Sequence, residues 1–248
     1  MANIYAISDL HGMYDIFEQV NNFIQSDDIV YFLGDATDRG PEGWKLMKAI
    51  YEHPNWVYLK GNHEDMLYNA YRTYKDFGYL DYEYMLLIQN GGDATWEDAM
   101  ADPEVEKWMG IVNSLPVYTD VINDNHIHIH LCHSGYLPAN PGKIESHHVA
   151  HDMLWDRRHY LYKWNKKVYG YDIVVHGHTP IPYIKDELEG TYKEPWEFGA
   201  YWYCPDDEAM LEHKCCIDNA TYRTNTACLL DLNTFDEHIF RSSMKKCF

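Results

Sequence analysis

The chain has few basic residues for its length. Lys and Arg number 20 against 39 Asp and Glu, which gives a formal charge of −19 over 248 residues. A nucleic-acid partner needs a basic surface to meet the phosphate backbone, so this composition argues against one. If the substrate is anionic, its attraction must come from a few Arg or Lys side chains or from bound metal.

A long apolar run is also missing from the sequence. No stretch approaches the roughly 18 apolar residues of a membrane span. The N-terminal MANIYAISDLHG does not show the basic segment followed by an apolar one that is typical of a secretory signal. We therefore expect no membrane association and a cytoplasmic location.

The six cysteines do not form any CxxC pair. They lie at positions 132, 204, 215, 216, 228 and 247. In a chain without a secretory signal, free thiols are expected rather than disulfides. A zinc ion bound through the adjacent Cys215 and Cys216 stays open as an alternative.

No Pro/Gly/Ser-rich linker, low-complexity tract or internal repeat divides the chain. A single domain spanning residues 1–248, with one insertion, is the simplest organisation for this length.

Apolar runs alternate with helical patterns in the first 60 residues. Short runs at 3–8, 28–33 and 56–60 predict buried strands. Apolar residues at helical spacing follow the first run at 13–25, and Pro41 marks the first turn of the next helix. This repeat of strand, loop and helix predicts an α/β sheet with functional loops at the strand ends.

Later segments add a helical insertion and further strands. Residues 64–114 are expected to be mainly helical and to lie beside the sheet. The run at 172–180 repeats the pattern of strand and polar loop. Residues 214–218 and 226–232 have strand composition with no helix between them, which predicts a second, antiparallel group of strands. The aromatic and acidic segment 185–213 is either a surface hairpin or a flap over the substrate cleft.

Three consecutive strand ends carry polar motifs, SDLHG, GDATDRG and GNHE. Their residues with ligand or acid–base chemistry are Asp9, His11, Asp35, Asp38, Asn62 and His63. Strand ends of an open sheet converge in space, so these groups should share one crevice. A mixture of carboxylate, imidazole and amide oxygen is typical of a Mn, Fe or Zn site rather than of a structural zinc site built from cysteines.

In this order and spacing the motifs resemble those of the phosphoprotein phosphatase (PPP) family of calcineurin-like metallophosphoesterases, in its bacterial and phage Ser/Thr phosphatase form. The later LCHSG and VVHGHTP resemble the remaining histidine loops of that family, and LLDL resembles its closing strand. The resemblance implies an α/β sandwich of two mixed β-sheets flanked by helices. It also implies two divalent metal ions, with Mn expected in vitro and Fe or Zn as alternatives.

The resemblance further assigns ligands to the two ions. One ion would be held by Asp9, His11 and Asp35. The second would be held by Asp35, Asn62, His133 and His178. Asp35 would bridge the two ions, and a hydroxide shared by them would attack phosphorus.

Four more residues have roles that the resemblance implies. His63 would protonate the leaving oxygen, with Asp38 holding its ring and favouring the charged form. Arg39 and Arg157 would bind phosphate oxygens through their guanidinium groups. Lys60 is a weaker candidate, because many relatives have an arginine there.

The stretch NHIHIHLCHSG at 125–135 contains four histidines. Alternation along a strand places His126, His128 and His130 on one face and His133 on the apolar face. His133 also lies in the CHSG motif, so it alone is expected to bind metal. The other three are expected on a half-exposed or inter-sheet face.

For two other histidine pairs, the question is again which ring binds metal. In HGH the resemblance selects His178, which leaves His176 as a packing residue. His147 and His151 stand at helical spacing, and we interpret them as a polar helix face or part of the substrate groove. A further departure from the family is Ala220, at a position where glycine is usual. A different shape of the turn after Asp218 is therefore left open.

The activity expected from the resemblance is phosphomonoester hydrolysis, most simply on phosphorylated Ser or Thr of a protein. Symmetrical hydrolysis of diadenosine tetraphosphate, or of another small phosphoester, is the alternative. A remote alternative is a non-catalytic metal-binding scaffold, against which stands the presence of every implied ligand and of the acid. The partners expected are thus a phosphorylated protein or a small phosphoester, while the oligomeric state is not determined.

Overall fold

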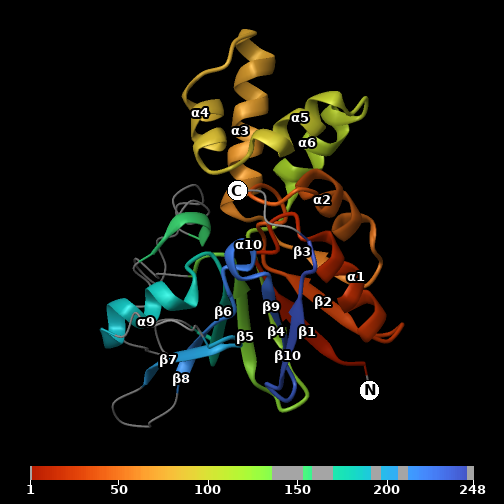
Figure 1. The fold of residues 1–248 in the computed structure, drawn as a ribbon. Coiled ribbons are helices and arrows are strands. Elements are labelled where there is room, and N and C mark those ends of the chain that lie inside the picture. Colours follow the sequence, from red (N-terminus) through yellow and green to blue (C-terminus); the bar gives the residue numbers. More distant parts are fainter. Residues whose placement is uncertain (1, 136–152, 158–169, 191–196, 206–211, 245–248) are drawn as a thin grey trace.

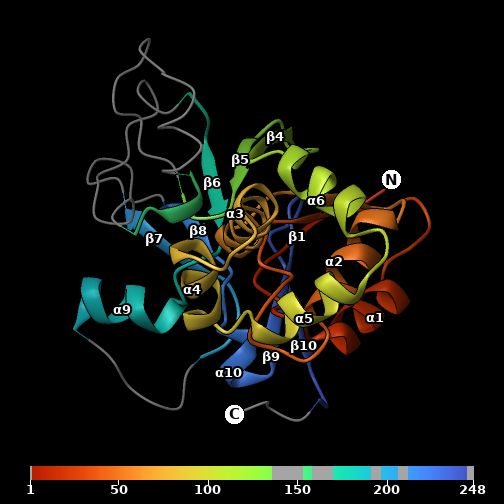
Figure 2. The ribbon, with the colours of Figure 1, turned by 90° about the horizontal axis from the view of Figure 1, so that it is seen from above.

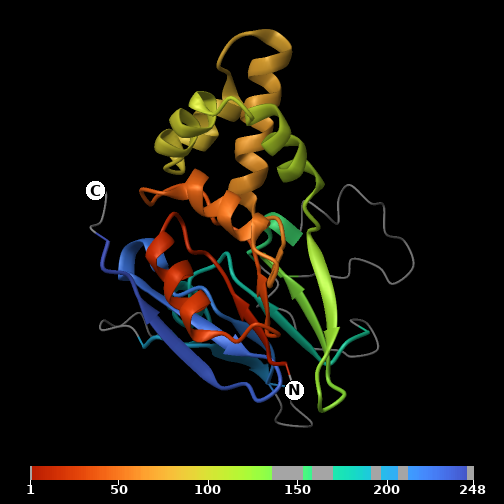
Figure 3. The same ribbon diagram turned by 90° about the vertical axis from the view of Figure 1, so that its right-hand side faces the viewer.

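The computed structural model describes residues 2–135, 153–157, 170–190, 197–205 and 212–244. Within these residues, two five-stranded sheets pack against each other, and a group of helices stands over one end of them (Figure 1, Figure 3). Figure 2, from above, shows α3 near the middle, with α1 and α2 on one side and α9 on the other.

The first sheet has the strand order β10-β9-β1-β2-β3. Its strands are β1 (Ile4–Ile7), β2 (Ile29–Phe32), β3 (Trp56–Tyr58), β9 (Thr226–Asp231) and β10 (Glu237–Arg241). The first three are parallel, and β9 pairs antiparallel with both β1 and β10. The crossovers are α1 (Tyr14–Phe23) and α2 (Gly43–Glu52).

The second sheet has the order β4-β5-β6-β8-β7. Its strands are β4 (Tyr118–Ile122), β5 (His128–Cys132), β6 (Ile173–His176), β7 (Tyr201–Pro205) and β8 (Glu212–Cys216). The central three are parallel, and β4 and β7 are antiparallel edge strands. The helix α9 (Ile181–Glu189) follows β6, and the short α10 (Thr221–Thr224) precedes β9.

Apolar alternation along the strands builds cores on both faces of each sheet. Between the sheets, Ala6 and Leu230 of the first sheet share a fully buried cluster with Leu131 and Val175 of the second. Full burial of a leucine such as Leu131 is worth about 1.5–3 kcal/mol. On the outer faces, α1 and α2 cover the first sheet and α9 covers β7 and β8.

The segment that follows β3 is helical throughout. It consists of α3 (Asn62–Phe77), α4 (Tyr82–Gln89), α5 (Asp93–Ala101) and α6 (Val105–Ser114). Their buried residues, among them Leu67, Trp96 and Trp108, belong to the same cluster as the outer face of the first sheet. The insertion is therefore packed onto the sheet that carries the first three polar loops.

The predicted α/β sandwich of two mixed sheets with a helical insertion is confirmed. The expectation of a separate antiparallel group of C-terminal strands is wrong. The strand from 214–218 lies in the second sheet, parallel to β6, whereas the strand from 226–232 lies in the first sheet, and α10 separates them. Of 185–213, the described part is the end of α9 and the antiparallel pair β7–β8, which agrees with the hairpin alternative.

The expectation of free thiols agrees with the cysteines in the described part of the chain. Cys132, Cys215, Cys216 and Cys228 are buried free thiols. Cys215 faces the core between the sheets and Cys216 packs with α9, so the two thiols do not share a ligand cluster in the described part of the chain. Among the described helices, none is long and apolar enough to cross a membrane.

The buried carboxylate of Glu64 joins the loops after β2 and β3. Its Oε2 accepts the N–H groups of Asp35 at 2.9 Å and Gly61 at 2.8 Å. Its Oε1 accepts those of Ala36 at 2.9 Å and Thr37 at 3.3 Å. Glu64 is the third residue of α3, so the bond to Gly61 has the form of half a capping box. Four backbone donors that would otherwise be orphaned at a strand end are thereby satisfied.

Replacing Glu64 with Gln should destabilise the fold by about 2–5 kcal/mol. The amide nitrogen of Gln cannot accept, so two or more buried N–H groups lose their partner at about 1–3 kcal/mol each. Urea unfolding of metal-stripped protein measures the change without the contribution of metal binding.

The matched control is Glu97→Gln, because Glu97 is exposed on α5. It should stay within about 0.5 kcal/mol of the parent. Equal stability of the two variants would contradict the role given to Glu64.

Candidate metal centre

The backbone of the polar loops is bent into the left-handed region at six of the residues singled out from the sequence. These residues, with φ from 44° to 68°, are Asp9, His11, Asp35, Asp38, Arg39 and His178. A non-glycine residue pays roughly 1–2 kcal/mol for this conformation, and such strain concentrates at functional sites. The bends turn the side chains of three different strand ends toward one another.

Hydrogen bonds between loops hold these bends in place. The N–H of His11 donates to the carbonyl of Asp35 at 2.9 Å. The insertion contributes two contacts, because Asp38 N–H donates to Thr95 Oγ1 at 2.9 Å and Arg39 N–H donates to the carbonyl of Gly91 at 2.8 Å. The loop after β2 is thus fixed from α5 as well as from Glu64.

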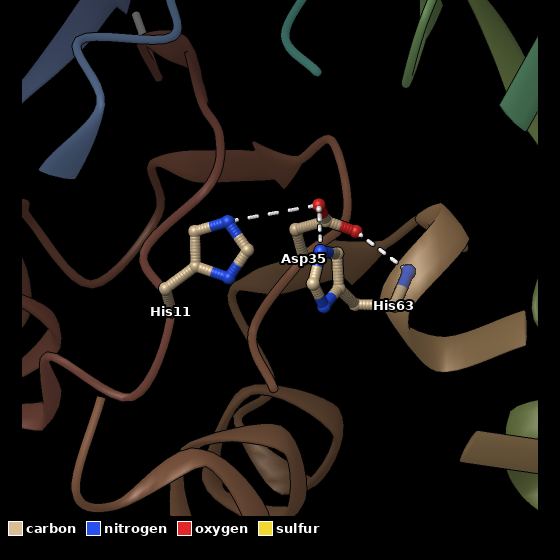
Figure 4. Close-up of side chains that lie close together, drawn as sticks. All are labelled: His11, Asp35 and His63. Atoms are coloured by element: carbon tan, nitrogen blue, oxygen red, sulfur yellow. Dashed lines mark hydrogen bonds and ion pairs between the residues drawn. The ribbon is translucent and has the colours of Figure 1, made fainter. Parts of the chain in front are cut away.

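Two groups of potential metal ligands share Asp35. In the first, His11 Nε2 lies 3.7 Å and His63 Nε2 3.8 Å from Asp35 Oδ2 (Figure 4). Figure 4 also shows the backbone N–H of His63 donating to Asp35 Oδ1, at 3.0 Å. All three side chains are buried, so they are shielded from bulk solvent.

The second group lies on the other side of the Asp35 carboxylate. His133 Nε2 is 3.3 Å from Asp35 Oδ1, and His178 completes the group. The Asn62 side-chain oxygen lies 2.9 Å from His133 Nε2 and 2.8 Å from His178 Nδ1. Asp35 is therefore common to the two groups.

Asp9 lies at the rim of both groups. Its Oδ2 accepts the His178 N–H at 3.0 Å and pairs with the hydroxyl of Ser8. A Cβ on Gly177 would stand 2.1 Å from that oxygen, so only glycine lets the HGH loop approach Asp9. Asp9 is buried beside the cluster, but its carboxylate lies outside the two tightest ligand groups.

Burial and neighbouring charges shift the pKa values of these groups. Burial raises the pKa of Asp9 to about 6, opposed by His133 and reinforced by Asp35. Burial would also raise the pKa of Asp35, but His133 and His63 hold it well below its usual range. For His11, burial and then Arg39 lower the pKa well below the usual value, which favours the neutral imidazole.

The donors present fit divalent metal ions. Burial and then the charges of His133 and Arg157 lower the pKa of His178, so His178, like His11, is held neutral, the form that ligates metal. At this site, three buried polar atoms have no hydrogen-bond partner among the described residues: Asp38 Oδ1, His63 Nε2 and His178 Nε2. Of these, His178 Nε2 belongs to a ligand group, and a set of carboxylate oxygens and imidazoles is the donor chemistry of a Mn, Fe or Zn site.

His63 and Asp38 form a fully buried pair. His63 Nδ1 lies 2.7 Å from Asp38 Oδ2, which fixes the ring so that Nε2 points toward Asp35. Burial raises the pKa of Asp38, whereas its contacts with His63 and Thr95 lower it. The geometry suits a histidine that carries a proton on the nitrogen facing the cluster.

The two arginines expected to bind phosphate are placed differently. A guanidinium nitrogen of Arg39 lies 3.0 Å from His11 Nε2. The guanidinium carbon of Arg39 lies 4.5 Å from the centre of the Tyr222 ring. Arg157 is exposed, and its charge is felt at His178. Lys60, in contrast, donates to the carbonyl of Asn113 at the end of α6 and does not face the cluster.

Of the other histidines singled out from the sequence, those in the described residues do not belong to either ligand group. His130 is buried on the face opposite Ile129 and pairs across the hairpin with Asp120 at 2.6 Å. His128 is half-buried, and His126 precedes β5 in a turn with φ of 61°, so its expected place on the strand face is wrong. The buried His176 contacts the Tyr203 hydroxyl, which agrees with a packing role. His147 and His151 lie outside the described residues.

The turn after Asp218 keeps the backbone shape that a glycine would have. Ala220 has φ of 53°, and its N–H donates to Asp218 Oδ1 at 2.7 Å. The substitution therefore leaves a turn whose strain glycine would not incur.

Several residues of the site were not found from the sequence. Glu64 could have been, because its position three residues after Gly61 is a capping signal. Gly91, Thr95 and Tyr222 come from the insertion and from α10, and no local pattern connects them with the loops that they contact.

Comparisons with known proteins agree with the geometry. A family model described as calcineurin-like phosphoesterase matches residues 2–190. Serine/threonine-protein phosphatase 2 of Escherichia coli (strain K12) is 24% identical over 192 residues, covering 74% of this chain and 82% of that protein. An asymmetrical bis(5'-nucleosyl)-tetraphosphatase, PrpE of Geobacillus sp. (strain WCH70), is 25% identical over 203 residues, covering 71% and 78%.

Solved structures show the same fold. A protein serine/threonine phosphatase from Saccharomyces cerevisiae superposes with a TM-score of 0.60 at 13% identity, covering 100% of this chain and 82% of that one. With the family model spanning most of the sequence and the ligand groups gathered at its strand ends, this chain belongs to the calcineurin-like phosphoesterase family.

Proposed function

We propose that the protein is a metal-dependent phosphomonoester hydrolase acting on phosphorylated Ser or Thr residues of proteins. The observation that carries this proposal is the buried His63–Asp38 pair, set beside two ligand groups that share Asp35. An alkoxide leaving group such as that of serine requires a proton, and this pair can supply it at the cluster.

Six residues would hold two divalent ions: Asp9, His11, Asp35, Asn62, His133 and His178. Bound there, the ions would supply a nucleophilic water at neutral pH. Asp35 would be shared by both, and Mn²⁺ is the ion that we propose for reconstitution in vitro.

The chain's own residues then have separable tasks. Arg39, fixed by the Tyr222 ring and by its backbone bond to Gly91, orients the phosphoryl oxygens. Arg157, whose charge lowers the pKa of His178, adds positive charge near the centre. His63 donates a proton from Nε2 to the leaving oxygen, and Asp38 keeps that nitrogen aimed at the cluster.

The second candidate is hydrolysis of a dinucleoside tetraphosphate. Its support is that relatives of similar identity carry both kinds of name. Against it stands the scarcity of basic side chains in a chain of charge −19, since four phosphates need more than two arginines. A non-catalytic scaffold is disfavoured by the intact His63–Asp38 pair.

A rate comparison on two substrates tests the proposed function. Protein stripped with a chelator and restored with Mn²⁺ should release phosphate from a phosphoserine peptide faster than it cleaves diadenosine tetraphosphate. Preference for the dinucleotide would keep the metal site and reject the phosphoprotein substrate. Inactivity on both substrates with two ions bound would reject both enzymatic functions.

Replacing His63 with Asn should lower kcat for the phosphoserine peptide by roughly 10²–10⁴-fold, because the leaving alkoxide loses its proton donor. The loss should be much smaller with p-nitrophenyl phosphate, whose leaving group is stable without a proton. Metal analysis of the same variant should still find two ions. Loss of one ion would instead make His63 a ligand, which its place 3.8 Å from Asp35 permits.

Replacing Asp35 with Asn should abolish metal binding and activity together. Asn tolerates the left-handed backbone of this position, so the loop should keep its shape while the shared charge is lost. Elemental analysis after dialysis measures bound metal. Asp27→Asn, at an exposed position, is the matched control and should bind metal as the parent does. Full activity of the Asp35 variant would reject the shared carboxylate.

A further inference from the structure

A cleft of about 410 Å³ lies between the loop after β2, the turn from α4 to α5 and α10. It begins at the metal centre, because Arg39 and Tyr222 line it and both also contact His11. The Tyr222 and His11 rings are 5.5 Å apart, and the His11 and His63 rings are 4.8 Å apart. The His11 ring therefore contacts both Tyr222, in the cleft wall, and His63, the residue proposed to protonate the leaving group.

The lining of this cleft is poor in positive charge. In this described part of the chain, Arg39 is the one basic side chain among the lining residues, and the reacting phosphate would engage it. The other side chains offer amides, a carboxylate and apolar surface: Gln89, Asn90, Asp93, Pro41 and Ala94. A leaving group bearing further phosphates would meet the Asp93 carboxylate with no cation left to neutralise it.

We propose that this cleft binds the peptide flanking the phosphorylated residue and that Asp93 selects a basic side chain in that flank. The inference rests on the proposed phosphoprotein function and extends it to a sequence preference. The amides of Gln89 and Asn90 are suited to the polar groups of an extended peptide backbone. Asp93 is exposed at the first position of α5, where it can reach an Arg or Lys of the substrate. The net charge of −19 favours approach of such a segment.

Three phosphoserine peptides that differ only in one flanking residue, Arg, Ala or Glu, test the inference. With Mn²⁺-restored protein, kcat/KM should be roughly two- to fivefold higher for the Arg peptide than for the Ala peptide, as expected for one solvent-exposed ion pair. Asp93→Asn should bring this ratio toward one. Asp93→Lys should reverse the order and favour the Glu peptide, which a merely structural role of Asp93 would not produce.

Asp98→Asn is the control, because Asp98 is exposed on the same helix and does not line the cleft. Its ratio should equal that of the parent. If the peptides are hydrolysed and the ratio survives in both Asp93 variants, the cleft assignment is overturned and the proposed function stands. If no peptide is hydrolysed while diadenosine tetraphosphate is, both are overturned.

Discussion

The loops that build the metal centre depend on one buried carboxylate. Glu64 accepts backbone N–H groups from the loops after two neighbouring strands, including that of Asp35 itself. Those loops hold residues in the left-handed region, a conformation that the chain would leave if its N–H groups had no acceptor. Since α3 begins at Asn62, the same contact also fixes the helix that delivers Asn62 and His63. The geometry of the ligands on these two loops thus depends in part on an interaction that involves no ligand side chain.

Charge at the centre follows from burial. A buried carboxylate such as Asp35 is costly unless positive charge or donors surround it, and three imidazoles lie within 4 Å of its oxygens. Burial also lowers the pKa of His11 and His178, which keeps both rings neutral. At His133 the effect of burial is outweighed by Asp35 and Asp9, and the pKa is raised to about 9. Without an ion, His133 therefore supplies a positive charge where one is needed. Binding a divalent ion would displace that proton, which couples metal affinity to pH.

The sequence predicted the parts of the site that are local and periodic. Each of the first three polar motifs follows a buried strand, and alternation along β5 separated His133 from His130. What it could not predict are contacts between segments far apart in the chain. Thr95 accepts from Asp38 across 57 residues, and the Tyr222 ring lies under Arg39. The sequence misplaced His126 because the turn after β4, held by Asn123, runs to Ile127, and β5 begins only at His128.

The distribution of charge explains how an acidic protein can act on an anionic ester. Positive side chains lie at the centre, where Arg39 contacts His11 and the charge of Arg157 acts on His178, and a bound divalent ion would add to them. The cleft that begins at Arg39 has no further basic side chain among its described lining residues, which include the amide of Asn90 and the carboxylate of Asp93. Under the proposed function, a substrate with one phosphate and no further negative charge would fit this lining, whereas a polyphosphate would bring further negative charge toward Asp93. Selectivity between the two substrate classes would then depend on the lack of basic side chains in the cleft as well as on the positive charge at the centre.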